Sequence, residues 1–265
     1  MRKLASAGGA PLVLNINESV MTMSQTPSQP LTPSTKTERI LVIEDEESLA
    51  VGIRDALEHA GYEVEVSHDG LRGLELARKG EFNLVLLDLM LPGMNGIDLL
   101  KSLRKERVDV RVMILTARAD EPDVIKGLGE GADDYMTKPF SPAELVARVT
   151  AQFRRRDLDS APPSFIELPG GIRVDLARLE VHRADERVAL TPREGDILKY
   201  LIQHRDRVVT RDDLLVDVWH YSNGKVETRT VDIHIVGLRR KVEPDPTSPT
   251  LIQTVRGKGY RWHNN

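Results

Sequence analysis

The chain of 265 residues contains no cysteine, which excludes disulfide bonds and cysteine-ligated zinc sites. This absence is compatible with a reducing compartment. No apolar stretch approaches the roughly 18 residues that a membrane-spanning helix needs. Aromatic residues are few, but the apolar fraction of 40% supports folded cores, and the length suits two domains of roughly 100–200 residues each. We therefore expect a cytoplasmic protein of two domains without a membrane segment.

The first 37 residues contain little that can fold. From residue 24 onward they are rich in Ser, Thr, Pro and Gln, and this composition buries too little apolar area to offset the entropy lost on ordering. Polar residues and a proline interrupt the only apolar patch, 12–16, which argues against a cleaved signal peptide. We predict a disordered leader over residues 1–37. The sequence leaves three possible start positions, Met1, Met21 and Met23.

Charge is distributed unevenly along the chain, although the formal net charge is only −4. Residues 38–164 hold 17 Lys and Arg against 25 Asp and Glu, whereas residues 165–265 hold 17 against 15. Within the second half, residues 225–261 carry 8 basic and 4 acidic side chains. An acidic half followed by a half with a basic end predicts two different tasks on one chain.

The stretch FNLVLLDLMLPGMNG, residues 82–96, delivers an acid to the end of a buried strand. Its apolar run, 84–87, is typical of a strand that is covered on both faces of a parallel sheet. Asp88 ends the run, and Pro92 and Gly93 then break regular structure. Ligands of open α/β sheets bind at this carboxyl edge. Considered alone, Asp88 has the alternative interpretation of a residue that merely starts a turn.

Four more short apolar runs alternate with helical patterns in the first half. We expect the five strands at 40–43, 64–66, 84–88, 112–116 and 135–137, with a helix after each. The last helix has Ser141 as its N-cap and Glu144 three residues later, the pattern of a capping box. This alternation predicts an α/β fold with a doubly wound, five-stranded parallel sheet.

Polar or charged residues stand at the carboxyl ends of four of these strands. They are Glu44 and Asp45, Asp88, Thr116 and Lys138, and they meet at one edge of the predicted sheet. Clustered carboxylates repel each other unless a cation or a proton neutralises one of them. Mg²⁺ takes carboxylate ligands together with the phosphate of a substrate, and a carboxylate can accept a phosphoryl group as an acyl phosphate. The pattern therefore predicts Mg²⁺-assisted phosphoryl transfer, in which Thr116 and Lys138 hold the phosphate oxygens.

The motifs ILVIEDE, LVLLDLMLPGMNG, ILTAR and GADDYMTKPF occur in this order between residues 39 and 155. Together they make this half similar to the receiver (CheY-like) domain of two-component response regulators of the OmpR/PhoB family. The resemblance implies that Asp88 is the phosphoacceptor and that a sensor histidine kinase is the donor. It also implies a Mg²⁺ site formed by Asp45, Asp88 and the backbone carbonyl of Met90, with Glu44 in support.

The same resemblance assigns roles to the last strand and its neighbours. Thr116 and Tyr135 would be the switch pair, and the Lys138 side chain would bind phosphate. The peptide bond between Lys138 and Pro139 is expected to be cis. Phosphorylation adds charge and acceptor oxygens at Asp88, so that Thr116 moves inward and Tyr135 turns into the space that opens.

The resemblance further implies a homodimer of phosphorylated receivers. Asp134 with Arg148, and Asp133 with Arg155, would form ion pairs across a two-fold interface. Val124 departs from the family, which usually has a basic residue at this position. Because exposed ion pairs contribute little individually, we still expect the dimer.

The second half has a different pattern of apolar residues. Short alternating apolar runs between 165 and 190, separated by turns, predict a small antiparallel sheet. Thr191 and Thr210 are expected N-caps of two helices, and a third helix is expected over 227–242. The core-facing side of this third helix would be formed by Val231, Ile235, Leu238 and Val242. Its outer side carries Arg229, Ile233, Val236, Gly237 and Arg240, flanked by Thr230, His234, Arg239 and Lys241.

A helix with one apolar seam and a basic outer face can enter the major groove of double-stranded DNA. The motifs LTPREGDILKYL, TRDDLLVDVW, ETRTVDIHIVGLRRK and IQTVRGKGYRW resemble the α+β winged helix-turn-helix domain of the same family. The resemblance makes the third helix the recognition helix and the loop 219–226 the contact with RNA polymerase. We expect DNA contacts from Arg229, Thr230, Ile233, His234, Arg239, Arg240, Thr254 and the wing residue Arg256. Val236 and Gly237 replace frequent arginines, so fewer guanine contacts are expected.

These observations predict four segments: the leader 1–37, a receiver domain 38–155, a linker 156–164 and a winged helix-turn-helix domain 165–263. The main hypothesis is a transcription regulator that phosphorylation of Asp88 switches and that acts as a dimer on direct repeats. One alternative is a DNA-binding protein without the switch, against which the intact acidic pocket argues. A phosphatase ranks last, because Met90 stands where a second acid would be needed. We therefore expect a regulator rather than an enzyme.

Overall fold

The computed structural model describes residues 37–106, 108–117, 126–153, 165–184, 186–221 and 229–263. The chain divides into Met1–Lys36 and one compact unit, Thr37–Asn265. Residues 1–36 of the predicted leader, and the linker expected over 156–164, lie outside the described residues.

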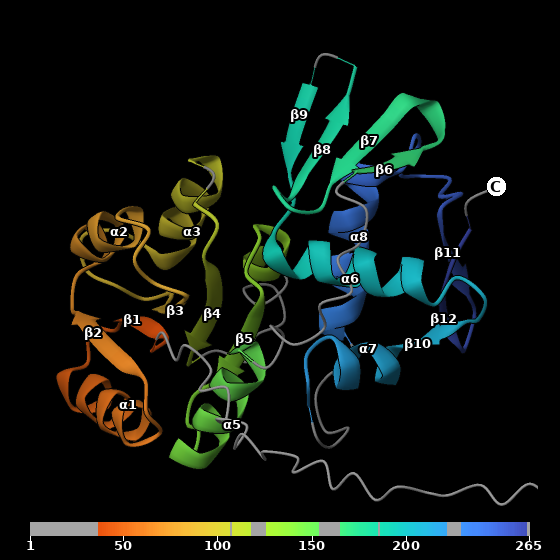
Figure 1. Ribbon diagram of the computed structural model, residues 1–265. Coiled ribbons are helices and arrows are strands. Elements are labelled where there is room, and N and C mark those ends of the chain that lie inside the picture. The colour runs from red at the N-terminus through yellow and green to blue at the C-terminus, as the bar shows by residue number, and fades with distance from the viewer. Residues whose placement is uncertain are drawn as a thin grey trace, which may run out of the picture. The chain divides into compact units, whose positions relative to one another are not determined.

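The first half of the compact unit contains a parallel sheet of five strands (Figure 1). Its order is β2-β1-β3-β4-β5, so that the central β3 has neighbours on both sides. The strands are β1 (Arg39–Ile43), β2 (Glu63–Ser67), β3 (Leu84–Asp88), β4 (Arg111–Thr116) and β5 (Asp134–Thr137). All neighbouring pairs are parallel, which confirms the doubly wound sheet that the sequence predicts.

Helices cover both faces of this sheet (Figure 1). α1 (Glu47–His59) and α5 (Pro142–Phe153) pack on one face, and α2 (Gly70–Arg78) and α3 (Gly96–Lys105) on the other. Successive strand residues alternate between the two faces, so Leu84 and Leu86 join the first core and Val85 and Leu87 the second. This two-sided burial explains why β3 is continuously apolar up to Asp88.

Local signals fix the ends of these elements. Asn95 caps α3 by accepting a hydrogen bond from the amide of Ile97, and the Ser141 hydroxyl accepts one from the amide of Glu144 at the start of α5. The Lys138–Pro139 bond is cis, as expected. Residues 126–129 are helical, whereas the start of the helix expected around Val124 lies outside the described residues.

The second half opens with an antiparallel sheet of four strands in chain order. Its strands are β6 (Phe165–Leu168), β7 (Ile172–Asp175), β8 (Glu180–Arg183) and β9 (Glu186–Ala189). The expected turn at Pro169–Gly171 is a short 3-10 helix, η2. These strands confirm the small antiparallel sheet of the sequence analysis.

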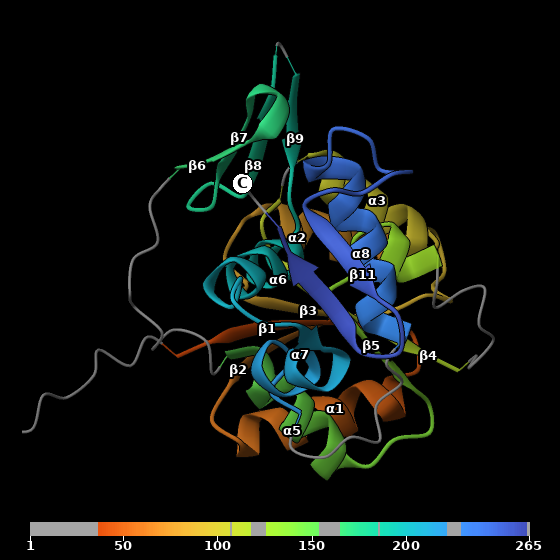
Figure 2. The same cartoon turned by 90° about the vertical axis from the view of Figure 1, so that its right-hand side faces the viewer.

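Three helices and a hairpin complete this half. α6 (Pro192–Gln203) and α7 (Arg211–Asp217) both begin with a complete capping box, formed by Thr191 with Glu194 and by Thr210 with Asp213. α8 (Arg229–Val242) has the four predicted core residues fully buried. β11 (Ile252–Val255) runs beside α8 in both Figure 1 and Figure 2. β11 pairs with β12 (Gly259–Trp262), which also pairs with the two-residue strand β10 (Val209–Thr210).

The hairpin between β11 and β12 depends on glycine. Gly257 and Gly259 both have positive φ, and a Cβ atom at Gly259 would lie 2.1 Å from the carbonyl oxygen of Val209. The tight turn leaves Arg256 and Lys258 exposed at its tip. This hairpin and α8 together form the helix-and-wing arrangement that the motifs predict.

Candidate functional site

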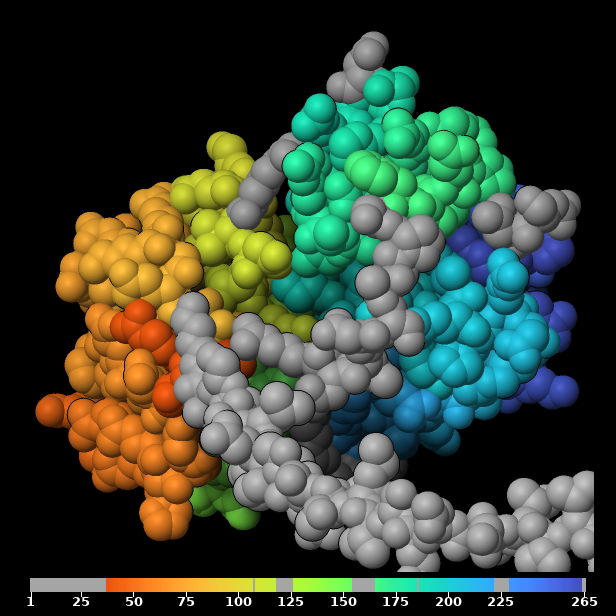
Figure 3. All heavy atoms as spheres, viewed as in Figure 1, coloured from red at the N-terminus to blue at the C-terminus, as the bar shows by residue number. Residues whose placement is uncertain are grey.

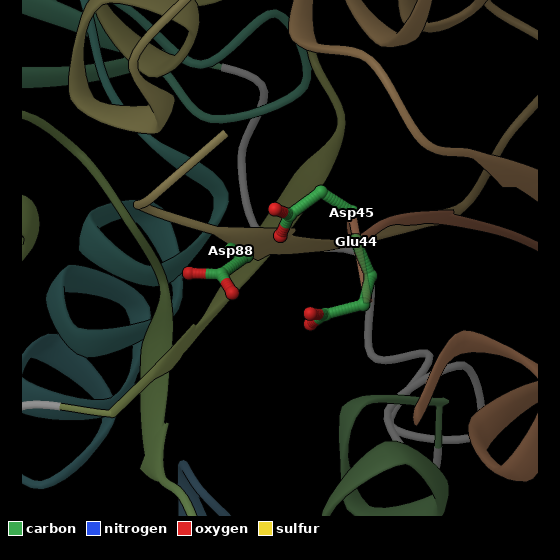
Figure 4. A group of neighbouring side chains, drawn as sticks. All are labelled: Glu44, Asp45 and Asp88. Carbon is green, nitrogen blue, oxygen red and sulfur yellow. The ribbon is translucent and has the colours of Figure 1, made fainter. Parts of the chain in front are cut away.

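Three carboxylates converge at the carboxyl edge of the parallel sheet (Figure 4). Glu44 and Asp45 follow β1 directly, and Asp88 is the last residue of β3. Each carboxylate offers an oxygen atom, and these atoms lie within 4.8 Å of one another. Glu44 and Asp88 are buried, whereas Asp45 is exposed. Parallel strand direction therefore brings together acids that are 44 residues apart in sequence.

Lys138, which follows β5, supplies positive charge to this cluster. Its Nζ atom lies 2.5 Å from Oδ2 of Asp88 and 2.9 and 2.7 Å from the two oxygens of Glu44. Burial alone would lower the pKa of the Lys138 ammonium, but its hydrogen bonds to Asp88 and Glu44 outweigh burial and raise the pKa. The lysine is thus held charged next to the predicted phosphoacceptor.

Glu44 is the most confined of the three acids, with no exposed surface. Burial raises the pKa of its carboxyl, and the hydrogen bond from Lys138 offsets this only in part. A cluster of three carboxylates with one ammonium has an excess of negative charge. Binding of a further cation would therefore stabilise this site.

The donor chemistry fits a hard divalent cation. Asp45 and Asp88 offer carboxylate oxygens, and the backbone carbonyl of Met90 follows two residues after Asp88, whose Oδ1 accepts a hydrogen bond from the Met90 amide at 2.9 Å. Oxygen ligands of this kind suit Mg²⁺. Gly96 lies close to the backbone of the site, since a Cβ atom at position 96 would be 2.2 Å from the carbonyl oxygen of Asp88.

The other predicted pocket residues lie on neighbouring strands. Thr116 ends β4 and is buried, 3% exposed, and its strand pairs with both β3 and β5. Tyr135 lies in β5, half-buried against the core that α2 and α3 share with the sheet. The structure therefore brings Asp88, Thr116 and Lys138 to one edge and places Tyr135 in the strand that ends at this edge.

The residues expected at the dimer face lie at the opposite end of β5. Asp133 and Asp134 are each 1% exposed, and Arg148 approaches Asp134 at 4.0 Å within the same chain. Asp133 accepts hydrogen bonds from the amide of Val112 at 2.9 Å and from Arg104 at 3.1 Å. Burial raises the pKa of Asp134, against the lowering effect of Arg148. Arg155 and Val124 lie outside the described residues.

The predicted DNA-contacting residues fall into two groups. Arg229, Arg240, Thr254 and Arg256 are exposed, and Ile233 is partly exposed. Thr230 and His234 are buried, 1% and 4% exposed, and Nε2 of His234 lies 3.0 Å from the carbonyl oxygen of Ala132 in the first half of the chain. Arg239 connects α8 to β11, since its guanidinium donates to the carbonyl of Ile252 at 3.0 Å and to the Thr254 hydroxyl at 2.8 Å.

Three residues that the sequence analysis did not single out connect the two halves. Arg193 in α6 donates to Oε1 of Gln152 at 2.6 Å, and the Tyr221 hydroxyl donates to Oδ2 of Asp134. A signal for Arg193 exists, because it stands four residues before the core residue Ile197 and hence on the buried stripe of the helix. Tyr221 has no comparable signal, because it follows α7 in a loop.

Two family models match the chain. The response regulator receiver domain matches residues 40–150, and the C-terminal domain of transcriptional regulatory proteins matches residues 185–262. No helix in the described part of the chain is long and apolar enough to cross a membrane.

Characterised relatives cover nearly the whole compact unit. The DNA-binding response regulator MtrA of Mycobacterium tuberculosis (strain ATCC 25618 / H37Rv) is 44% identical over 227 residues, which are 86% of this chain and 97% of MtrA. The alkaline phosphatase synthesis transcriptional regulatory protein PhoP of Bacillus subtilis (strain 168) is 42% identical over 231 residues, covering 84% of this chain and 95% of PhoP.

A solved structure extends the likeness to three dimensions. A mutant of RitR superposes with a TM-score of 0.71 at 32% identity, covering 86% of this chain and 100% of the RitR chain. The matched proteins are response regulators and transcription factors rather than enzymes. The chain therefore belongs to the OmpR/PhoB family of two-component response regulators, in which a receiver domain precedes a DNA-binding domain that regulates transcription.

Proposed function

We propose that a sensor histidine kinase in the cytoplasm transfers a phosphoryl group to Asp88 and that this modification switches DNA binding on. The observation that carries the proposal is the meeting of Glu44, Asp45, Asp88 and Lys138 at one sheet edge. The Asp88 carboxylate is the nucleophile, and its oxygen forms the bond to phosphorus as the bond to the donor breaks. The proposed domain limits are 38–155 for the receiver and 165–263 for the DNA-binding domain.

The chain's own groups would position and stabilise the phosphoryl group. Lys138 already contacts Asp88 at 2.5 Å, so its ammonium can follow a phosphoryl oxygen with little movement. Thr116 ends the neighbouring strand and would donate its hydroxyl hydrogen to a second oxygen. Asp45, Asp88 and the carbonyl of Met90 would hold Mg²⁺, which supplies charge neutralisation for phosphoryl transfer. The amide of Met90, which donates to Asp88, keeps the carboxylate oriented.

The switch would pass from Thr116 to Tyr135. Movement of Thr116 toward the phosphate vacates space beside β4, and Tyr135 on the adjacent β5 is half-buried and able to enter this space. The pairing of Ile114 with Tyr135 in the parallel register places the two strands side by side along this path. The proposed change is therefore a shift between two packings of the β4 and β5 region.

The output would be dimeric binding to double-stranded DNA. Two receivers would pair through Asp133, Asp134, Arg148 and Arg155, and two winged helices would bind half-sites of a direct repeat, about one DNA turn apart. Exposed Arg229 and Arg240 on α8, with Arg256 in the wing, supply contacts to phosphates and bases. The loop after α7 would contact RNA polymerase; residues 222–228 of this loop lie outside the described residues.

Incubation with acetyl phosphate and Mg²⁺ tests the proposal. Intact-mass measurement should find one phosphoryl group on the wild type and none on Asp88→Ala, and DNA affinity should rise only in the wild type. Asp55→Ala removes an exposed acid of α1 and is the matched control, which should behave as the wild type does. A wild-type protein that takes up no phosphoryl group would refute the switch. If this unphosphorylated protein still bound DNA, constitutive regulation would be favoured.

A further inference from the structure

A groove of about 510 Å³ lies between α8 and residues 126–130 of the receiver. Figure 3 shows yellow-to-olive atoms of the receiver directly against teal atoms of the DNA-binding domain, and Figure 2 shows the yellow-green helical residues 126–129 next to α8. The groove has the size of a site for a small molecule, since such sites typically measure roughly 300–1,000 Å³.

Two glycines leave space in this groove, one on each wall. A Cβ atom at Gly129 of the receiver would meet no described residue within 4 Å, and one at Gly237 of α8 would meet only Oε1 of Glu194, at 3.0 Å. Gly237 and its neighbour Val236 stand where the family frequently has arginines, whose long side chains would occupy much of this space. The groove is therefore a feature of this chain rather than of the general family pattern.

The wall formed by α8 is apolar between two cations. Arg229, Ile233, Val236 and Arg240 follow one another at spacings of four, three and four residues, so they share one face of the helix, and all four line the groove. Val236 is 47% exposed, one of six large apolar side chains with this much exposure in the described part of the chain. An apolar body that covers it in the groove would remove this surface from water.

The groove also offers positive charge from both walls. Lys126 lines it from the receiver and Arg240 from α8, and both side chains are exposed. Neither forms an ion pair with another of the described residues. A guanidinium donates paired hydrogen bonds to carboxylate or phosphate oxygens, and an ammonium adds further charge and donors. An acidic head group would therefore find two cations that the protein itself does not neutralise.

The two acids of the groove are paired with cations that do not line it. Glu130 lies 3.3 Å from the ammonium of Lys101, and Asp232 lies 2.7 Å from the guanidinium of Arg211. Asp232 also accepts a hydrogen bond from the Tyr260 hydroxyl at 2.5 Å. These partners reduce the repulsion that the two carboxylates would exert on an anion, so the groove is complementary to negative charge.

We infer that this groove binds a small amphipathic anion, whose carboxylate or phosphate head group contacts Lys126 and Arg240 and whose apolar body covers Ile233 and Val236. A DNA duplex cannot enter a space that the receiver walls on one side and α8 on the other. Because Ile233 and Arg240 are also expected DNA contacts, the bound anion excludes DNA from this face of α8. The exclusion of DNA rests on the proposed function, whereas the binding site stands on the shape and charge of the groove.

Three probes test the two parts of the site separately. The unphosphorylated full chain is titrated with octyl phosphate below its micelle concentration, and binding is measured by calorimetry. Octan-1-ol has the same apolar chain without the acidic head, and inorganic phosphate has the head without the chain. Octyl phosphate should bind at least about tenfold more tightly than either, because it alone uses both the cations and the apolar wall.

Gly129→Leu fills the groove from the receiver wall and leaves every expected DNA contact in place. It should weaken the binding of octyl phosphate by at least about tenfold. Gly52→Leu is the matched control, because Gly52 is an exposed glycine of α1 at which a Cβ atom would also meet nothing within 4 Å, and it should bind as the wild type does. Lys126→Met should weaken octyl phosphate about fivefold and leave octan-1-ol unchanged, because it removes a charge.

Octyl phosphate should also lower DNA affinity in the wild type and in Gly52→Leu, but not in Gly129→Leu. No binding to the wild type, or equal binding to the wild type and Gly129→Leu, would overturn the site. So would a groove that a second copy fills, in which case Gly129→Leu would dissociate an unphosphorylated dimer. If the probe binds while DNA affinity is unchanged, the exclusion of DNA is overturned. If no variant binds DNA under any condition, the proposed function fails and the calorimetry still decides the site.

Discussion

The two ends of β5 present acids in opposite ways. At the carboxyl end, Glu44 and Asp88 share the ammonium of Lys138, and the neighbouring Asp45 is exposed. At the amino end, Asp133 and Asp134 are buried and accept hydrogen bonds from several protein groups, including Arg104, Arg193 and Tyr221. The first cluster has an excess of negative charge that a ligand can neutralise. The second takes its donors from the protein itself, although Oδ1 of Asp134 accepts no hydrogen bond among the described residues.

This difference separates a site for chemistry from a site for assembly. An incompletely neutralised cluster responds to ions and to a phosphoryl group, which alter its charge directly. An edge held by protein donors responds to the loss or replacement of these donors, since a buried carboxylate left without donors is costly. β5 joins the two clusters, because Asp134 is its first residue and Lys138, which contacts Glu44 and Asp88, directly follows its last.

The largest effect is expected from Lys138→Met. The substitution leaves Glu44 and Asp88 buried without their cation, and breaking a buried ion pair costs about 3–5 kcal/mol of unfolding free energy. Mg²⁺ should restore much of this loss, because it neutralises the same carboxylates. Urea unfolding with and without Mg²⁺ measures both effects.

Lys101→Met provides the matched control, because Lys101 forms an exposed ion pair with Glu130 at 3.3 Å. Its loss should cost less than about 1 kcal/mol and show no dependence on Mg²⁺. Equal losses in the two variants would contradict the electrostatic distinction drawn for the carboxyl end.

Asp133→Asn should have the next largest effect, at the other end of β5. The neutral amide weakens the hydrogen bonds from Val112, Arg104 and Arg193, which should cost about 1.5–3 kcal/mol of unfolding free energy. Here Mg²⁺ should restore nothing. Asp55→Asn, at an exposed position of α1, should change stability by less than about 0.5 kcal/mol. If Mg²⁺ restored the unfolding free energy of Asp133→Asn, the two ends of β5 would not differ in their response to a cation.

The smallest effect is a pH dependence of stability near the amino end of β5. Burial lowers the pKa of His234 in the folded chain; Arg193 lowers it further, while the hydrogen bond to the Thr230 carbonyl and the nearby Asp133 and Glu194 act in the opposite direction. The neutral histidine therefore stabilises the folded chain at a pH above the ordinary value of about 6.5, and this contribution is lost as the pH falls below that value. The contribution of His234 to the free energy of unfolding, measured with urea, should fall between about pH 7.5 and about pH 5.5.

His234→Gln isolates this contribution, because the glutamine does not titrate. Asp134, whose pKa is raised mainly by burial, stabilises the folded chain on acidification in both proteins, so the difference between them reports the histidine. Identical pH profiles of unfolding for wild type and His234→Gln would show that the pKa of His234 is not lowered in the folded chain.

The parallel sheet and its site were predictable because periodicity and strand ends carry local signals. The apolar run before Asp88 marks a strand buried on both faces, and parallel direction then requires Glu44 and Lys138 to lie at the same edge. The buried seam of α8 followed from helical spacing in the same way. Contacts between the domains were not predictable, since they depend on residues that neither pattern distinguishes. Tyr221 is a loop tyrosine whose importance depends entirely on Asp134, 87 residues earlier.

The assignment of Asp133, Asp134, Thr230 and His234 illustrates the same limit. The family resemblance predicts their partners in an assembly, namely a second receiver and DNA. In this structure all four are buried, and Asp133, Asp134 and His234 each contact a residue in the other half of the chain. A sequence does not indicate which of two partners a surface holds in a given state, because the same hydrogen-bonding groups suit both.

One measurement tests the proposed connection between the two ends of β5 most directly. The chain is titrated with beryllofluoride in the presence of Mg²⁺, while DNA affinity and the monomer–dimer distribution are recorded on the same samples. We predict that the rise in DNA affinity and the formation of dimers follow one titration curve in the wild type and are absent in Asp88→Ala. A rise in DNA affinity or dimer formation that Asp88→Ala retains would contradict the account.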